Sequence, residues 1–312
     1  MRVTLTLLPL LSACLDLEAP GTLVPATVDE DPSLPRIELD DTVLHGEVFG
    51  DPADPLLVIV HGGPGMDYAG LEPLTALAGE GWQVLAYDQR GSGLSQRHEP
   101  GSTTAWTHPD DLAALIERFS PDGTAALVGH SWGGQLSAAT VQAYPERVTD
   151  VVLIEPGPFT GERWETLGLT RIDMSATHLN DLFWSEQMVG RDSHEQLDWH
   201  FQQLMSDQMP GYHMSKDDPM PIRRMGFVVY EDVMSSAMED GRPAWDFATG
   251  LDAWPGTAHF VWGGENTIMD EAYRAEQEAD WPSTTSTVLE GVGHDLPWLL
   301  VDDTIALIQE VL

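Results

Sequence analysis

The stretch Gly129-His130-Ser131-Trp132-Gly133 decides the fold of this chain. It follows a short apolar run at 125–128 and precedes a segment rich in small residues, a context that predicts a strand, a sharp turn and a helix. Such a turn strains the backbone of its central serine, so the positions two before and two after it must be nearly free of side chain, as Gly129 and Gly133 are. The turn lifts the Ser131 hydroxyl to where a base can reach it, and Ser131 is the predicted nucleophile.

Apolar runs alternate with helical segments on both sides of this turn. Continuous apolar strands separated by helices are typical of a parallel sheet covered on both faces, which predicts an α/β fold with a doubly wound, mostly parallel sheet. The predicted strands are 56–60, 82–87, 125–128, 151–154, 259–262 and 287–289, and the predicted helices include 109–118 and 304–311.

The alternation stops at residue 157 and resumes after residue 245. The sequence between these two positions has a helical pattern, is polar and rich in tryptophan, and contains most of the 12 methionines of the chain. An insertion at the carboxyl end of a parallel sheet would lie over the active site. We therefore expect a helical cap at 157–245 between two parts of one core at 36–156 and 246–312. Its methionine and tryptophan content fits an adaptable apolar pocket, and it fits an ordinary helical core as well.

The N-terminus predicts export and anchorage. Met1-Arg2 gives a positive start, an apolar run follows to Leu10, and Leu11-Ser12-Ala13-Cys14 closes it with small residues. Residues 1–14 resemble a bacterial lipoprotein signal with its lipobox, which implies lipid modification of Cys14 and an exported, membrane-anchored lipoprotein. Leu15, in place of an aspartate, favours the outer membrane. Residues 15–35, rich in Pro, Asp, Glu and Thr, are expected to form an extended tether.

Composition excludes several classes of partner and cofactor. The 51 acidic and 14 basic residues give a formal net charge of −37, which argues against nucleic acid because its phosphates would be repelled. Cys14 is the single cysteine, so no internal disulfide can form. There is no His-Glu-x-x-His pattern and no Cys/His cluster, and we expect neither a metal nor another cofactor.

A glycine-rich turn, His61-Gly62-Gly63-Pro64-Gly65, directly follows the predicted strand 56–60. Glycines here let backbone N–H groups approach a reacting carbonyl. The N–H of Gly63 and that of Trp132, the residue after the nucleophile, are the predicted oxyanion hole.

Three motifs in order carry a family resemblance. They are the turn at 61–65, Asp88-Gln89-Arg90-Gly91-Ser92-Gly93-Leu94-Ser95, and Gly129-His130-Ser131-Trp132-Gly133-Gly134. Together they resemble the proline iminopeptidase branch of the α/β-hydrolase fold, well over about 37–156, moderately in the C-terminal core and hardly in the cap. The resemblance implies that the segment at 88–95 is structural support beside the oxyanion loop.

The predicted general base is His294. It lies in Gly291-Val292-Gly293-His294, a glycine-rich loop after the last predicted strand, where an α/β-hydrolase keeps its histidine. Its imidazole would take the Ser131 proton and return it to the leaving group.

The third member of the triad departs from the family. The resemblance implies an aspartate in Gly-x-x-Asp after the strand ending at Trp262, and this chain has Asn266 there. Glu155, which ends the strand after the nucleophile helix, is the preferred acid, because some branches of this fold keep their acid at that position. Glu265 and Asp270 are alternatives, as is a site with no acid.

The sequence predicts a serine hydrolase that cleaves an amide or ester in a small molecule or short peptide. The resemblance makes a proline iminopeptidase-like aminopeptidase the first candidate and a carboxylesterase the second. The family binds a free N-terminal amine through acidic cap residues, for which Glu231 is a candidate, although a surface role fits it as well. Asn266 supports a further alternative, a non-catalytic surface lipoprotein that retains the fold.

Overall fold

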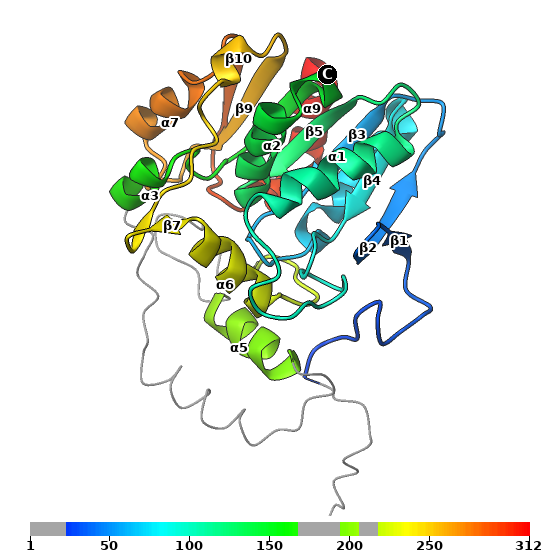
Figure 1. Cartoon of the computed structure of the whole chain (residues 1–312). Coiled ribbons are helices and arrows are strands. Elements are labelled where there is room, and N and C mark those ends of the chain that lie inside the picture. The colour runs from blue at the N-terminus through cyan, green and yellow to red at the C-terminus, as the bar shows by residue number, and fades with distance from the viewer. Residues whose placement is uncertain (1–22, 168–193, 206–217) are drawn as a thin grey trace, which may run out of the picture.

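Figure 1 shows the computed structural model of the chain, in which residues 23–167, 194–205 and 218–312 are described. The predicted signal and Cys14 lie outside these residues, so lipid anchorage stays a prediction. In the described part of the chain, no helix combines the length and the apolar character needed to cross a membrane.

The core is a sheet of eight strands in the order β1-β2-β4-β3-β5-β6-β9-β10. All neighbours from β4 to β10 pair in parallel, whereas β1 and β2 form an antiparallel edge. The strands are β1 (Arg36–Glu38), β2 (Val43–Phe49), β3 (Leu56–Val60), β4 (Gln83–Tyr87), β5 (Ala125–His130), β6 (Val148–Ile154), β9 (Thr257–Gly263) and β10 (Thr284–Leu289). The predicted α/β-hydrolase class of sheet is confirmed.

Helices cover both faces of this sheet (Figure 1). Alternate residues of each buried strand face opposite ways, so β3 sends Val58 into one apolar cluster and Ile59 into the other. Helices α1 (Thr107–Phe119), α2 (Trp132–Ala143) and α7 (Glu271–Glu278) close the first cluster. The 3₁₀ helix η1 (Ala69–Glu80) and helices α8 (Leu296–Leu299) and α9 (Val301–Val311) close the second.

The strand order places the site. From β3 the chain crosses to β4 on one side and then returns to β5 on the other, so the loops after β3 and β5 diverge from adjacent strands. Ligands of open α/β sheets bind at such a switch point, outside the carboxyl ends of the strands. The loop at 61–65 and Ser131 leave the sheet here, which brings the predicted oxyanion loop and the predicted nucleophile to one edge.

The insertion leaves and re-enters the core through paired segments. Thr160 and Asp246 form an isolated antiparallel bridge, and the N–H of Phe247 donates to the Phe159 carbonyl at 2.8 Å. Its described elements are α3 (Gly161–Leu167), α5 (Glu195–Met205), α6 (Phe227–Ser236), β7 (Met238–Glu239) and β8 (Arg242–Pro243). Figure 1 shows α5, α6 and β7 together beyond one end of the strands of the sheet.

Residues 23–35 pack against the rest of the protein and do not form the extended tether that was predicted for residues 15–35. The predicted start of the folded part, after residue 35, is therefore wrong. The Val28 side chain is 2% exposed, and its N–H donates to the Leu94 carbonyl at 2.8 Å. Leu23 donates its N–H to Glu195 of α5, and the Pro25 carbonyl accepts from Arg224. The polar composition of the segment concealed these contacts, because backbone groups make them.

Gly133 provides a test of the turn. A Cβ at this position would lie 1.9 Å from the Val60 carbonyl oxygen, whereas a Cβ at exposed Gly79 would meet nothing within 4 Å. We expect Gly133→Ala to lower the unfolding free energy by about 3 kcal/mol, because backbone atoms cannot yield. Gly79→Ala should change it by less than about 0.5 kcal/mol. Urea unfolding measures both, and equal midpoints for the two variants would contradict this account.

Candidate active site

Ser131 occupies a strained turn between β5 and α2. Its backbone has φ 57° and ψ −119°, a conformation that non-glycine residues rarely adopt. Hydrogen bonds hold this conformation: the Ser131 N–H donates to the Ile154 carbonyl at 3.0 Å, and the Ser131 carbonyl accepts from the N–H groups of Gly134 and Gly157. The predicted nucleophile therefore stands on the turn that the sequence indicates, tied to the end of β6.

His294 lies in the loop after β10, as expected, and its residue is 4% exposed. Nε2 of His130 lies 3.0 Å from the His294 carbonyl oxygen and must carry a proton to bond it. The two imidazole rings are 4.5 Å apart between centroids. Because His130 directly precedes Ser131, this bond fixes the histidine loop beside the nucleophile. This role of His130 was not predictable from the sequence, where the residue is marked only by its place in the turn.

The structure brings Glu155 to His294. Glu155 lies just after β6 with φ 46° and is completely buried. Its Oε2 is 3.4 Å from His294 Nδ1, and its Oε1 accepts the Gly263 N–H at 2.6 Å. Asn266 Nδ2 also donates to Oε2. Of the acids considered from the sequence, Glu155 is the one in contact with the predicted base.

The other two acids lie elsewhere. Glu265 and Asp270 are exposed, and Asp270 caps the first turn of α7 by accepting the Tyr273 N–H at 3.0 Å. The buried side chain in this loop is Asn266, which the family pattern would replace with aspartate. The structure thus favours neither Glu265 nor Asp270 as partner of His294, because both side chains point to solvent.

Burial raises the pKa of Glu155 to about 7. The Gly263 N–H, the Asn266 amide and the positive charge of Arg274 act in the opposite direction and favour the carboxylate. A carboxyl group in this setting is poised near neutrality, a property that marks functional sites more often than structural ones.

A buried hydrogen-bond network supports the loop at 61–65. The Gln89 N–H donates to His61 Nε2 at 2.9 Å, so the proton of this imidazole is on Nδ1, which faces the Gly62 carbonyl. The Gln89 side chain donates to the His61 carbonyl and accepts from the Trp132 indole. One glutamine therefore links the loop that carries Gly63 to the residue that follows Ser131, which places both predicted oxyanion donors on a common support.

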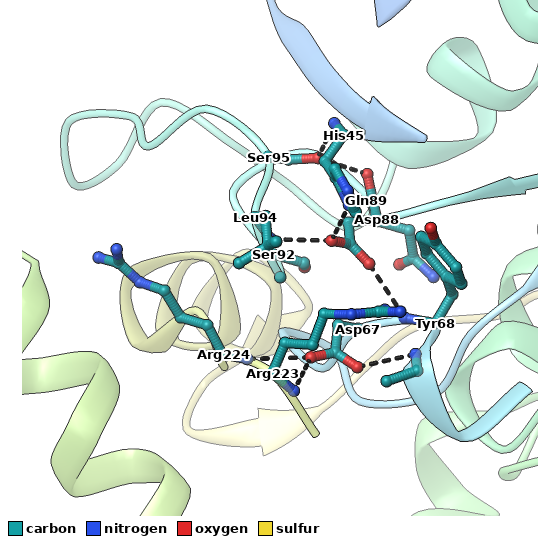
Figure 2. A network of polar contacts seen from close by, with 12 residues as sticks. His45, Asp67, Tyr68, Asp88, Gln89, Ser92, Leu94, Ser95, Arg223 and Arg224 are labelled. Atoms are coloured by element: carbon teal, nitrogen blue, oxygen red, sulfur yellow. Dashed lines mark hydrogen bonds and ion pairs between the residues drawn. The ribbon is translucent and has the colours of Figure 1, made fainter. Parts of the chain in front are cut away.

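Figure 2 shows two buried carboxylates, Asp88 within the core and Asp67 where the core meets Arg223 and Arg224 of the cap. Asp88, at the end of β4, accepts from His45 Nδ1 and from the Tyr68 and Leu94 N–H groups at 2.8–3.0 Å. Asp67 accepts the N–H groups of Arg223 and Arg224 at 2.5 and 3.0 Å. Burial, together with the charge of Asp88, raises the pKa of Asp67 to about 7.

A third carboxylate, Asp198 of α5, is completely buried at the same junction. It accepts from Arg97 Nε of the core at 2.9 Å, and from Arg224 Nε and the Phe227 N–H of the cap at 2.8 and 3.0 Å. These contacts fix α5 and the start of α6 to the core loop after β4. Sequence reasoning missed Asp198, which resembles any other acid in this acidic chain.

A small apolar cavity of about 20 Å³ lies between the cap and the predicted oxyanion loop. The core contributes Gly63 and Trp132 to its wall, and the cap contributes Val233, Met234 and Trp245. This small cavity lies beside both residues that are predicted to supply the oxyanion donors.

Glu231 does not reach this cavity. Its side chain is exposed on α6, and the buried acid next to it, Asp232, accepts the Gly101 and Thr103 N–H groups of the core. Among the described residues, no group of three or more His, Cys, Asp or Glu side chains is arranged to hold a metal ion. The structure thus gives Glu231 a surface position, not a place at the predicted site.

Comparison with known proteins agrees with this arrangement. A family model described as alpha/beta hydrolase fold matches residues 55–170. The chain has the α/β-hydrolase fold, and the family model matches the part that contains the predicted nucleophile turn. The proline iminopeptidase of Lacticaseibacillus rhamnosus is 31% identical over 119 residues, which are 38% of this chain and 40% of that protein. The 2-(acetamidomethylene)succinate hydrolase of Mesorhizobium japonicum is 38% identical over 105 residues, 34% of this chain and 37% of that protein.

The structural likeness extends further than the sequence likeness. The crystal structure of the proline iminopeptidase of Mycobacterium smegmatis aligns with a TM-score of 0.64 and covers 89% of this chain and 97% of its own, at 18% identity. That identity supports the fold alone. The matched sequence spans only about two fifths of the two curated relatives. The resemblance to proline iminopeptidases is confirmed. These comparisons show the fold of this chain and do not show its activity.

The pKa of Glu155 predicts a pH dependence of stability. A carboxyl group whose pKa is raised on folding stabilises the fold at low pH, and this stabilisation is lost as pH rises through the folded value of about 7. We expect the unfolding free energy of Glu155→Gln to fall less than that of the wild type between about pH 5 and 8, by about 2–3 kcal/mol. Denaturant unfolding across this range measures it. Glu265→Gln, at an exposed position, is the control. If the unfolding free energy of Glu155→Gln falls with pH as steeply as that of the wild type, the raised pKa of Glu155 is refuted.

Proposed function

We propose that this α/β-hydrolase is a serine hydrolase that cleaves an ester or amide through an acyl-enzyme. The observation that carries the proposal is the contact of Glu155 with His294 beside the strained Ser131 turn. A hydrogen bond from His294 Nδ1 to the carboxylate leaves Nε2 to act as the base, the arrangement of a Ser-His-acid triad.

The chemistry then follows from the geometry. Ser131 Oγ attacks the carbonyl carbon while His294 takes the hydroxyl proton, and the N–H groups of Gly63 and Trp132 stabilise the oxyanion. His294 returns the proton to the departing alcohol or amine, which leaves an acyl-serine. Water repeats the sequence and releases the acid. Glu155 keeps the imidazole in the required tautomer and stabilises its positive charge.

The first candidate for the activity is a proline iminopeptidase-like aminopeptidase. The sequence likeness to the Lacticaseibacillus rhamnosus protein supports it. The three motifs of the resemblance lie in the part of the chain that forms the oxyanion loop and the nucleophile turn. They support the reaction more strongly than the substrate.

The second candidate is a carboxylesterase, favoured by the cavity. Its described walls are apolar and aromatic, with Trp132, Trp164 and Trp245 among them and Gln135 as their polar member. A free N-terminal amine calls for a carboxylate, whereas the acyl group of a simple ester calls only for apolar surface.

A fluorophosphonate probe tests the reaction class against the non-catalytic alternative. We expect the folded wild type to be labelled and Ser131→Ala to remain unlabelled, because the probe reacts only with an activated serine. Glu155→Gln should be labelled about 10³-fold more slowly, since the base loses its anionic partner. Glu265→Gln, exposed and remote from the base, should match the wild type. Absence of labelling in folded wild type would favour a binding protein instead.

Two arylamides and an ester distinguish the substrate classes. For the first candidate we expect prolyl-arylamide to be cleaved at least tenfold more efficiently than its N-acetylated form, because a cap carboxylate would recognise the free amine. The measurement is kcat/KM for both, with an aryl butyrate alongside. Equal turnover of the two arylamides, or turnover of the ester alone, would reject the aminopeptidase and support the esterase.

A further inference from the structure

Both ends of the Asn266 side chain are in use. Its Oδ1 accepts the N–H groups of Ile268 and Met269, each at 3.1 Å. Because these two groups can only donate, the amide orientation is fixed, and Nδ2 must be the atom that faces Glu155. The residue is 2% exposed, so water does not compete for these bonds.

The Asn266 amide meets the catalytically relevant oxygen of the acid. Nδ2 donates to Oε2 of Glu155, the same oxygen that lies 3.4 Å from His294 Nδ1. The other oxygen is held by the Gly263 N–H, from the end of β9. The carboxylate of β6 is therefore oriented by two donors from the β9 end, one on each oxygen.

The loop that presents these donors is itself fixed. Arg274 of α7 donates from Nε to the Met269 carbonyl at 2.7 Å and from Nη2 to the Gly263 carbonyl at 2.8 Å. Its guanidinium also lies over the Trp262 ring, 5.6 Å from the centroid. Because the loop is anchored on both sides of Asn266, the Asn266 amide is held rigidly enough to orient the Glu155 carboxylate.

We propose, on the basis of the proposed serine-hydrolase function, that Asn266 is a positioning residue that orients the Glu155 carboxylate toward His294 and favours its charged form. In the family that this chain resembles, an aspartate occupies the position of Asn266. Here the acid is Glu155, which follows β6, and Asn266 supports it. Asn266 thus contributes to the triad through Glu155, and its presence is not the sign of a lost activity.

The groups around Glu155 give the expected direction of the pH effect. His294, His130 and Arg274 are the titratable or charged groups that act on it, and Asn266 adds a neutral donor. Loss of that donor destabilises the anion, and an aspartate in its place adds a like charge, so both changes raise the pKa of the acid. Since the reaction needs the anion, the acid limb of the activity profile moves to higher pH.

The experiment follows the rate of fluorophosphonate labelling against pH. Asn266→Ala should be about tenfold slower near neutrality, the size of one hydrogen bond to a charged group, with its acid midpoint raised by about one pH unit. Asn266→Asp, nearly isosteric and still able to accept from residues 268 and 269, should raise the midpoint further. Asp270→Ala disturbs the cap of α7 on the same loop and should leave the midpoint unchanged.

A double-mutant cycle separates positioning from general loop stability. In a Glu155→Gln background, Asn266→Ala should have little further effect, because its target is already neutral. The same tenfold loss in both backgrounds, or a wild-type midpoint in Asn266→Asp, would overturn the proposal. Labelling of the wild type that is lost in Ser131→Ala would at the same time uphold the serine-hydrolase function, so the two failures are distinguishable.

Discussion

The close approach of α2 to the ends of β3 and β5 is the constraint on which this structure depends. A Cβ at Gly133 would overlap the Val60 carbonyl, and one at Gly129 would lie 2.4 Å from the Gly133 carbonyl oxygen. Glycines at both positions let the helix begin this close to the sheet, and hydrogen bonds to Ile154 and Gly157 hold Ser131 in its strained conformation. Backbone packing thus fixes α2, β5 and the loop at 61–65 relative to one another, without a contribution from any catalytic side chain. The strain at Ser131 is sustained by packing elsewhere.

The same edge of the sheet has to accommodate a buried carboxylate. Glu155 is placed by β6 in an interior with little water, where an isolated charge would be costly. The N–H of Gly263, the amide of Asn266 and the imidazole of His294 reduce that cost, each from a different element. Their convergence explains why the acid can reside at β6 instead of after β9. The β9 loop supplies donors to the acid, and with an aspartate at 266 two carboxylates would meet.

Local patterns were sufficient to predict the core, and they also led to the predictions for two positions of the candidate site. Ser131 lies in a glycine-rich turn after the apolar strand β5, and His294 lies in a glycine-rich loop after β10, and both patterns are visible in a few consecutive residues. The use of Asn266 was not predictable in this way, since it depends on a partner 111 residues distant. The contacts of Asp198 are equally non-local. The antiparallel edge of β1 and β2 was missed because its mixed burial leaves no continuous apolar run.

The net charge of −37 acquires a structural meaning at the junction of core and cap. Much of the acidity is solvated surface, yet Asp67, Asp88 and Asp198 are buried and each accepts at least three hydrogen bonds or ion pairs. Arg97, Arg223 and Arg224 come from the 14 basic residues of the chain and lie at this one junction. A buried carboxylate is stable only where donors converge, so Asp67 and Asp198, whose donors include cap residues, favour one fit between cap and core. Polar contacts therefore hold the cap to the core, whereas the described residues that line the apolar cavity carry no charge.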